Sequence, residues 1–216
     1  MPSASAKPDW NALAPHYGRQ VWLERNSLRT LLDLLDPGPG DLLLDVATGT
    51  AALPAELAVR EGHPREVVGV DRSPEMLRRA PDLPPRWQLS QADATALPFA
   101  DDSFDLVTAS YLLHLLDRET RSRVIGECQR VLRPDGRIGV ITIAPPRRRV
   151  TAALTAPVRR AAERYPARFV GLKPLDPGPD LVDGGFSDVV GRHSLRGYPA
   201  LCVVARKPAG TAARAD

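Results

Sequence analysis

The stretch Leu42–Ala51, with the sequence LLLDVATGTA, decides the fold of this chain. Three consecutive leucines lead to an acid, and the chain then turns through small residues. A short apolar run bounded by turn residues is typical of a strand buried on both faces of a parallel sheet. Gly49 lacks a Cβ atom, so the backbone can turn sharply there and let a ligand approach. In open α/β sheets ligands bind at this carboxyl end of the strands, where Asp45 stands.

The charge of this loop restricts the class of ligand. A nicotinamide cofactor would place its pyrophosphate at such a turn and requires the pattern Gly-x-Gly-x-x-Gly. The loop has Gly49 alone, with Ala47 and Ala51 in the flanking positions, and the carboxylate of Asp45 would repel a pyrophosphate. It would attract a ligand that carries an ammonium and a sulfonium group, which describes S-adenosylmethionine. The alternative is that Asp45 only caps the turn that follows it.

Composition favours a single domain with reduced thiols. Of the 216 residues, 43% are hydrophobic and 25% are charged, which suits one domain with a complete core and at most a small lid. The net charge of +3 comes from scattered arginines, so nucleic acid is not an expected partner. The arginines at 147–149 and 159–160 could bind an anionic substrate group or RNA, or form a solvated helix face. Cys128 and Cys202 lie far apart, and we expect buried thiols in the cytoplasm. No apolar run approaches the ~20 residues that cross a bilayer.

Apolar runs alternate with helical patterns, which predicts a parallel sheet with right-handed crossovers. After the strand at Leu42 we expect strands over residues 67–71, 86–89, 104–109 and 138–143, then an antiparallel pair over 187–194 and 198–206. Helical patterns cover residues 10–35 (as one or two helices), 51–60, a start at Ser73-Pro74, a short turn at 112–116, then 119–132 and 147–164. Gly136 is expected to make a sharp turn before the strand at Ile138. The expected organisation is an N-terminal helical segment and possible lid (1–36), a main domain (37–207) and a flexible tail (208–216).

Three acids, Asp45, Asp71 and Asp93, close three successive apolar runs. The stretches around them resemble the successive motifs of the class I S-adenosylmethionine-dependent methyltransferases, and their wording is closest to the subgroup of ubiquinone and menaquinone C-methyltransferases. The matching stretches are LDVATGT (44–50), VGVDRSPEML (68–77), ADATALPF (92–99) with DSFD (102–105), and LRPDGR (132–137). This resemblance implies an α/β fold: a Rossmann-like seven-stranded, mostly parallel sheet with helices on both faces and an antiparallel C-terminal strand pair.

The resemblance also implies how the cofactor is held. Asp71 would accept hydrogen bonds from both ribose hydroxyls, while Asp93 would accept one from the adenine amino group and Ala94 would offer its N–H to a ring nitrogen. The expected cofactor-binding set is Asp45, Ala47, Thr48, Gly49, Asp71, Arg72, Met76, Asp93, Ala94 and Ser110. Other readings stay open: Asp71 as a helix-start acid, Asp93 as a turn former, and Met76 and Leu97 as core residues. Ala51 departs from the family's glycine, and its methyl group could crowd the cofactor or shift the turn.

The implied activity is transfer of the methyl group of S-adenosylmethionine to a small-molecule acceptor, such as a quinol, a phenol or another oxygen or carbon nucleophile, with S-adenosylhomocysteine as product. A base is needed only if the acceptor must lose a proton, and His114 with Tyr111 is the candidate because imidazole titrates near neutral pH. His114 could equally be a packing residue. His16 and Tyr17 could cover the acceptor from the N-terminal helix.

Two other functions remain possible at this point. The chain could be a non-catalytic scaffold subunit that binds S-adenosylmethionine, or a nicotinamide-linked oxidoreductase, which the broken glycine pattern disfavours. No cluster of His, Asp and Glu indicates a metal, and a homodimer is compatible with the sequence.

Overall fold

The computed structural model describes residues 9–145, 173–197 and 199–209, and within the first helix it leaves the side chains of residues 13 and 16–21 undescribed. The helix expected over residues 147–164 and nearly all of the C-terminal tail lie outside this part. In the part of the chain that is described, no helix is long and apolar enough to cross a membrane.

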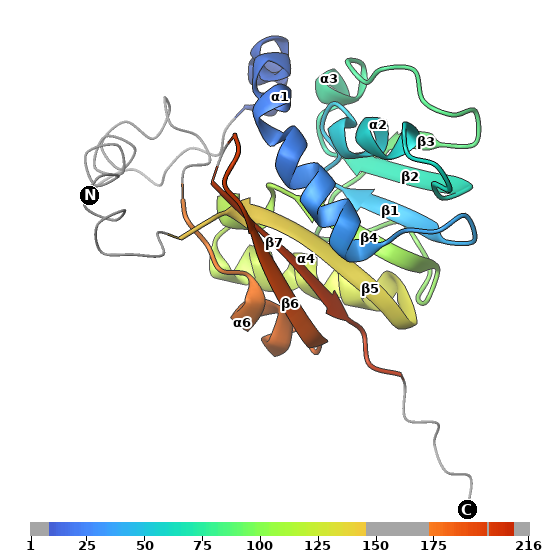
Figure 1. Ribbon diagram of the computed structural model, residues 1–216, viewed down its shortest axis with the longest axis vertical. Coiled ribbons are helices and arrows are strands. Elements are labelled where there is room, and N and C mark those ends of the chain that lie inside the picture. The colour runs from blue at the N-terminus through green and yellow to red at the C-terminus, as the bar shows by residue number, and fades with distance from the viewer. Residues whose placement is uncertain (1–8, 146–172, 198, 210–216) are drawn as a thin grey trace, which may run out of the picture.

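One seven-stranded sheet forms the centre of the molecule, with the strand order β3-β2-β1-β4-β5-β7-β6 (Figure 1). The strands are β1 (Leu42–Val46), β2 (Glu66–Asp71), β3 (Gln88–Gln91), β4 (Phe104–Ser110), β5 (Leu132–Ile143), β6 (Ser187–Ser194) and β7 (Ala200–Arg206). The neighbours from β3 to β5 pair in parallel, while β7 pairs antiparallel with both β5 and β6. The expected Rossmann-like α/β sheet with an antiparallel C-terminal pair is thus confirmed.

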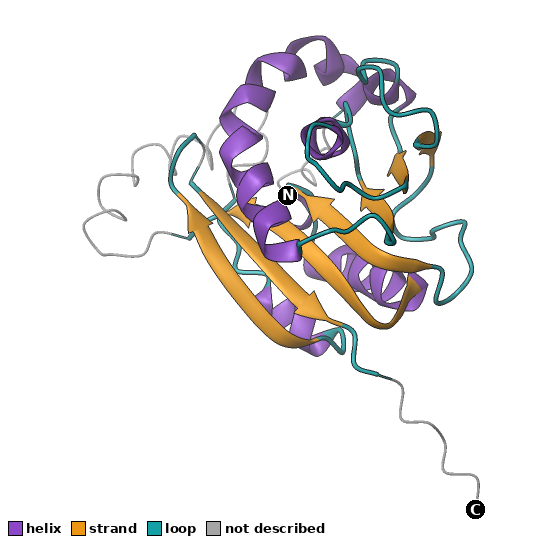
Figure 2. Ribbon diagram, turned by 45° about the vertical axis from the view of Figure 1, so that its right-hand side comes forward, coloured by secondary structure: helices purple, strands orange, loops and turns teal. Residues whose placement is uncertain are grey.

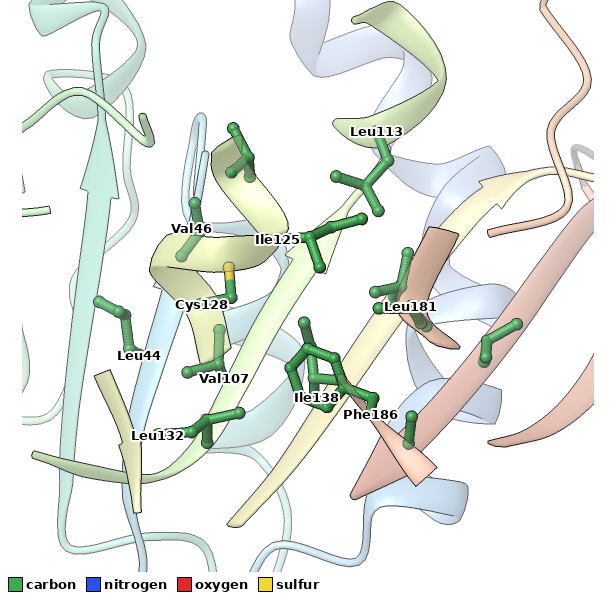
Figure 3. Close-up of a cluster of buried hydrophobic side chains, with 14 of the residues drawn as sticks. Leu44, Val46, Val107, Leu113, Ile125, Cys128, Leu132, Ile138, Leu181 and Phe186 are labelled. Atoms are coloured by element: carbon green, nitrogen blue, oxygen red, sulfur yellow. The ribbon is translucent and has the colours of Figure 1, made fainter. Parts of the chain in front are cut away.

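Helices cover both faces of this sheet (Figure 2). They are α1 (Trp10–Leu35), α2 (Ala52–Ala58), α3 (Pro74–Leu77), the 3-10 turn η1 (Leu113–Leu115), α4 (Arg118–Val131) and α6 (Gly178–Asp183). Adjacent residues of one strand point to opposite faces. Leu43 therefore packs into the cluster under α1 and α2, whereas Leu44 packs into the cluster under α4 and α6 (Figure 3). The two buried layers fix the sheet between the helices.

The first helix is continuous, although the sequence allowed a break. Asp9 caps it by accepting hydrogen bonds from the backbone N–H groups of Asn11 and Ala12. Pro15 lies inside the helix and removes one backbone donor one turn after the cap. The C-terminal half compensates through Leu28, Leu31 and other leucines that are fully buried against the sheet. The expected span of residues 10–35 is confirmed as one element.

Several details differ from the expectation. The fifth strand already begins at Leu132, six residues before the expected start, so the segment 132–137 is part of β5. The third strand begins two residues later than expected, because Trp87 closes a turn on Pro84 and anchors its indole N–H on the carbonyl of Pro64. Gly136 does not have a positive φ; the left-handed residue is Asp135, with φ of 65°. Glycine is needed at 136 because a Cβ atom there would lie 2.8 Å from the carbonyl oxygen of Arg133.

The short helix α6 was not predicted from the sequence. Its Pro- and Gly-rich start resembles a turn, and its six residues are too few to give a helical period. Leu181 is fully buried against α4 and the sheet, and that tertiary contact supports the helix.

Candidate active site

The turn after β1 has an unusual backbone. Ala47, Gly49 and Ala51 each have a φ of 57°, in the left-handed region that favours glycine. A Cβ atom built on Gly49 would meet nothing within 4 Å, so this residue faces open space. The methyl group of Ala51, in contrast, is fully buried in the protein. The methyl group of Ala51 therefore does not face the open space in front of Gly49.

Asp45 lies at the end of β1 and is almost completely enclosed, with 2% of its surface exposed. Its Oδ1 accepts a hydrogen bond of 2.7 Å from the hydroxyl of Thr108 on the neighbouring strand β4. Burial raises the pKa of Asp45 to about 6, against the lowering effect of the Thr108 and Thr48 hydroxyls and with a small further rise from the charge of Asp71. An added positive charge nearby would favour the ionised form of this carboxylate.

Asp71 connects three segments of the site. Its Oδ2 accepts from the backbone N–H of Gly49 at 2.9 Å, and its Oδ1 accepts from the N–H of Ser73 at 2.8 Å. Burial raises the pKa of Asp71, while these two hydrogen bonds and the positive charge of Arg72 oppose the rise. Each carboxylate oxygen has a second lone pair, so Asp71 can still accept hydrogen bonds from a ligand.

Asp93 follows β3 in a more exposed position. Its Oδ1 accepts from both the N–H and the hydroxyl of Thr95, each at 2.8 Å. These bonds lower the pKa of Asp93, and the charges of Arg72 and Arg123 lower it further. Asp93 therefore does form a turn, as one interpretation of the sequence allowed, and these hydrogen bonds fix its side chain at the edge of the sheet.

A small cavity of about 80 Å³ opens between these strand ends and the first turn of α1. Its lining consists of Trp10, Ala47, Gly49, Asp71, Arg72, Met76, Ser110, Tyr111, Leu112 and Leu115. The hydroxyl oxygen of Ser110 is buried and, within the described residues, has no hydrogen-bond partner. An open cradle at Gly49, a carboxylate and an unsatisfied hydroxyl fit a polar ligand such as the nucleoside of S-adenosylmethionine.

The sequence did not indicate that Trp10 belongs to this site. It starts α1, and the neighbouring Asn11 accepts a hydrogen bond of 2.6 Å from the hydroxyl of Ser73 through its side-chain oxygen. Ser73 also caps α3 by accepting from the N–H of Met76. The start of α1 is therefore fastened to the segment that follows Asp71, 62 residues away in the chain. Periodicity shows only that Trp10 begins a helix, and no local signal shows where that helix is docked.

The candidate catalytic residues Tyr111 and His114 lie together after β4. Their rings meet edge to face, with centroids 6.1 Å apart, and His114 is buried. The Tyr111 and Ser27 hydroxyl oxygens are 2.7 Å apart. Because Ser27 already donates its proton to the carbonyl of Glu24, the Tyr111 hydroxyl must be the donor. Tyr111 thus binds α1, and it has a left-handed φ of 58° at the cavity wall.

The structure brings together most but not all of the expected site residues. Ala47, Gly49, Asp71, Arg72, Met76, Ser110 and Tyr111 line the cavity, whereas Asp45, Thr48, Asp93, Ala94 and His114 are not part of its lining. Leu97 packs in the core, as one reading of the sequence allowed. The side chains of His16 and Tyr17 lie outside the described part of the structure. Among the described residues, no group of three or more His, Cys, Asp and Glu could hold a metal ion.

A second, larger groove of about 590 Å³ runs along the other flank of α1, next to α2. It includes Trp22 and Val59, which are exposed, and Glu56, which binds Arg25 and Arg29 of α1. None of the three strand-end acids lines it. The smaller cavity is therefore the candidate active site.

Comparisons with known proteins indicate the family of this chain. A family model described as "Methyltransferase domain" matches residues 43–136. The demethylmenaquinone methyltransferase of Lactobacillus johnsonii is 30% identical over 158 residues, which are 68% of this chain and 64% of that protein. The ubiquinone/menaquinone biosynthesis C-methyltransferase UbiE of Geotalea daltonii is 32% identical over 150 residues, 64% of this chain and 63% of that protein. The chain thus spans a little under two thirds of the length of these curated relatives.

Solved structures show the same fold. A methyltransferase of Haloferax volcanii, in complex with the Trm112 methyltransferase activator, matches with a TM-score of 0.69 at 18% identity, covering 94% of this chain and all of that one. The [4+2]-cyclase SpnF matches with a TM-score of 0.66 at 18% identity, covering 97% of this chain and 100% of that one. The fold by itself therefore does not decide the reaction. The motifs at the strand ends, together with the family and sequence matches, identify residues 43–136 as a methyltransferase domain of the class I S-adenosylmethionine-dependent type.

Proposed function

We propose that this protein transfers the methyl group of S-adenosylmethionine to a small-molecule acceptor of the quinol or phenol type. The observation that carries the proposal is the cavity at the strand ends, where Asp71 meets the open turn at Gly49. The matches to quinone C-methyltransferases support the acceptor class. When bound, S-adenosylmethionine supplies a methyl group that its sulfonium already activates, and the acceptor nucleophile displaces S-adenosylhomocysteine.

The chain's own residues have distinct tasks in this proposal. Asp71 accepts hydrogen bonds from the ribose hydroxyls, and Asp93 with the N–H of Ala94 recognises the adenine edge. Asp45 provides negative charge for the cationic methionine part. The turn at Gly49 lets the backbone approach the ligand, and Ser110 offers its hydroxyl at the cavity wall. The protein acts mainly by holding the acceptor in line with the methyl group and by excluding water.

We assign the N-terminal segment the role of a lid. A cavity of about 80 Å³ is smaller than the ~300–1,000 Å³ of typical ligand pockets, so the cofactor needs more space than the structure offers. Trp10 lines the cavity, and its neighbour Asn11 accepts a hydrogen bond from the Ser73 hydroxyl. Pro15 interrupts the helical hydrogen bonds directly after this turn, which makes residues 10–14 a natural moving unit.

His114 is the proposed base for acceptors that lose a proton. It lies one residue after Leu113, whose side chain is buried in the core, so the ring is held on a rigid turn. Tyr111 is better suited to position this ring than to accept a proton, because its hydroxyl donates to Ser27. His114→Ala should slow turnover while the affinity for S-adenosylmethionine stays unchanged, and full activity across the pH range would remove His114 from the mechanism.

Two measurements test the proposed function. Isothermal titration should show binding of S-adenosylmethionine and none of NAD; the reverse would make the protein a nicotinamide-linked oxidoreductase. A screen with labelled methyl donor against quinols, phenols and small amines should show transfer to one of the first two classes. Cofactor binding without transfer to any acceptor would favour the scaffold subunit instead. Sedimentation at micromolar protein tests the homodimer that the sequence allowed.

A further inference from the structure

The loop after β3 is held at its far end by a different element. At its start, Asp93 closes a tight turn, because its carbonyl accepts from the N–H of Ala96 at 3.0 Å and its side chain holds Thr95. The turn's own hydrogen bonds fix its shape but not its position relative to the sheet. The position is set by Leu97, which is buried in the core on the α4 face.

Two side chains of α4 bind the backbone of Leu97 on both sides. Glu127 accepts from the N–H of Leu97 through Oε2 at 2.7 Å, and Arg130 donates to the carbonyl of Leu97 through Nη2 at 3.0 Å. Arg130 also donates to the carbonyl of Phe99 through Nη1 at 2.7 Å. The loop is thus fastened at three backbone atoms by residues that lie about 30 positions later in the chain.

The two side chains also hold each other. Arg130 binds Glu127 with two parallel hydrogen bonds, both of 2.8 Å, through Nε and Nη2. The pair is largely shielded, with 20% of the Glu127 side chain and 30% of the Arg130 side chain exposed. The hydrogen bond from Arg130 lowers the pKa of Glu127, so the carboxylate stays charged through the neutral range. Charge-assisted and bidentate contacts of this kind fix direction as well as distance.

We propose that Glu127 and Arg130 are positioning residues for adenine recognition, which act by holding the Asp93–Leu97 loop at a fixed height against the bound nucleoside. The inference rests on the proposed function, because it assumes that Asp93 and Ala94 read the adenine edge. A carboxylate acceptor and an N–H donor must both lie within hydrogen-bond reach of adenine, and a shift of the loop by about 1 Å would break both contacts. Neither Glu127 nor Arg130 touches the ligand.

The test compares two ligands that differ only at the adenine edge: S-adenosylhomocysteine and its inosine counterpart, S-inosylhomocysteine. Inosine presents an oxygen to the Asp93 carboxylate and a protonated ring nitrogen to the N–H of Ala94. Acceptor then faces acceptor and donor faces donor, so the wild-type protein should bind the inosine ligand on the order of a hundredfold more weakly. The ratio of the two dissociation constants measures adenine recognition separately from overall affinity.

Arg130→Gln should raise the dissociation constant of S-adenosylhomocysteine about tenfold, the loss of one good hydrogen bond, and change that of S-inosylhomocysteine less than about twofold. Glu127→Gln keeps an oxygen for the N–H of Leu97 and should give a smaller loss, about threefold. Arg130→Lys keeps the positive charge but lacks the planar guanidinium group. Its dissociation constant for S-adenosylhomocysteine should lie between those of the wild type and Arg130→Gln. Because the series contains three variants, the loss of adenine recognition can be measured even if Arg130→Gln does not fold.

Asp180→Asn is the matched control. It removes the charge from another shielded ion pair of α4, in which Arg121 of this helix binds Asp180 of α6 at 2.7 Å. It should leave the ratio of the two dissociation constants unchanged. If the folded Arg130 and Glu127 variants weaken both ligands equally, or leave the ratio at the wild-type value, the positioning role is wrong while the proposed function stands. If the wild-type protein binds neither ligand, both proposals are wrong.

Discussion

The carboxyl ends of β1 and β3 each carry an aspartate, yet the two carboxylates lie in opposite environments. Asp45 ends a strand that pairs with neighbours on both sides, and it is buried, bound by Thr108 and has a raised pKa. Asp93 follows the edge strand, is exposed and has a lowered pKa, because Thr95 donates to it. The centre of the sheet thus makes ionisation of a carboxylate costly, whereas its edge does not.

The backbone of the turn after β1 also differs from that of the loop after β3 in how it is supported. The turn after β1 has two alanines, Ala47 and Ala51, in the left-handed region, and the neighbouring strand β2 supports it through the bond from the Gly49 N–H to Asp71. The loop after β3 depends instead on Glu127 and Arg130 of α4. We conclude that the two parts of the proposed cofactor site are held differently: the central turn by its buried surroundings and by the adjacent strand β2, and the edge loop by side chains of the helix α4.

Replacing Asp45 should change the free energy of unfolding more than any other substitution proposed here. It tests the part of the site at β1, in the centre of the sheet. The unfolded chain releases this proton near pH 3.8 and the folded protein at about 6, so the free energy of unfolding falls as the pH rises between these values. Two pKa units correspond to roughly 3 kcal/mol. In the absence of cofactor, Asp45→Asn should therefore gain about this amount of stability over the wild type between pH 4 and pH 7. Urea denaturation of both proteins across this range gives the difference, and parallel curves would contradict the burial of the charge.

Asp71 lies on β2, between the two extremes. Asp71→Ala should weaken binding of S-adenosylmethionine by ~1.5–3 kcal/mol, the scale of hydrogen bonds to a charged group. It also removes the acceptor for the N–H groups of Gly49 and Ser73, so the melting temperature should fall. Asp188→Ala, which changes an exposed carboxylate on the far strand β6, serves as the control for titration calorimetry. Unchanged affinity in a folded Asp71→Ala protein would argue against the ribose contact.

Asp93→Asn should affect binding but hardly stability. The amide keeps an oxygen for Thr95 and loses the charge that favours the adenine amino group, which predicts a loss of about 1 kcal/mol in cofactor affinity. The free energy of unfolding should change by less than ~0.5 kcal/mol, as for most exposed positions. A loss of several kcal/mol in the free energy of unfolding, measured by urea denaturation, would show that Asp93 at the edge of the sheet is as enclosed as Asp45 at its centre.

The smallest effects are expected for a pair of substitutions in the turn after β1. Gly49→Ala adds a methyl group in the left-handed region and should cost ~1 kcal/mol of stability, and the methyl group would face the cavity and reduce cofactor affinity. Ala51→Gly relieves the same strain but removes a buried methyl group, so the net change in stability should stay below ~1 kcal/mol. Affinity should not change in the second variant, and a change there would mean that the Ala51 methyl group does reach the ligand.

Much of the site could be predicted because its signals are local. Asp45, Gly49 and Asp71 each stand next to a strand or turn that a few neighbouring residues define. Trp10 could not be placed in this way, because its position in the cavity depends on how α1 docks on the segment after Asp71. The same holds for Thr108, which is an ordinary strand residue until β4 pairs with β1 and brings it to Asp45.

The sequence by itself determined the order of strands and helices, the acids at the strand ends and the class of cofactor. Hydrophobic periodicity and turn-forming residues depend on positions close together in the chain, so they can be recognised without knowledge of the fold. Only the tertiary structure decided which acid is buried, which loop is held by α4 and how far α1 closes the cavity. Those properties arise from contacts between residues 30 to 63 positions apart, such as Leu97 with Glu127 and Asp45 with Thr108, and no pattern within one element encodes them.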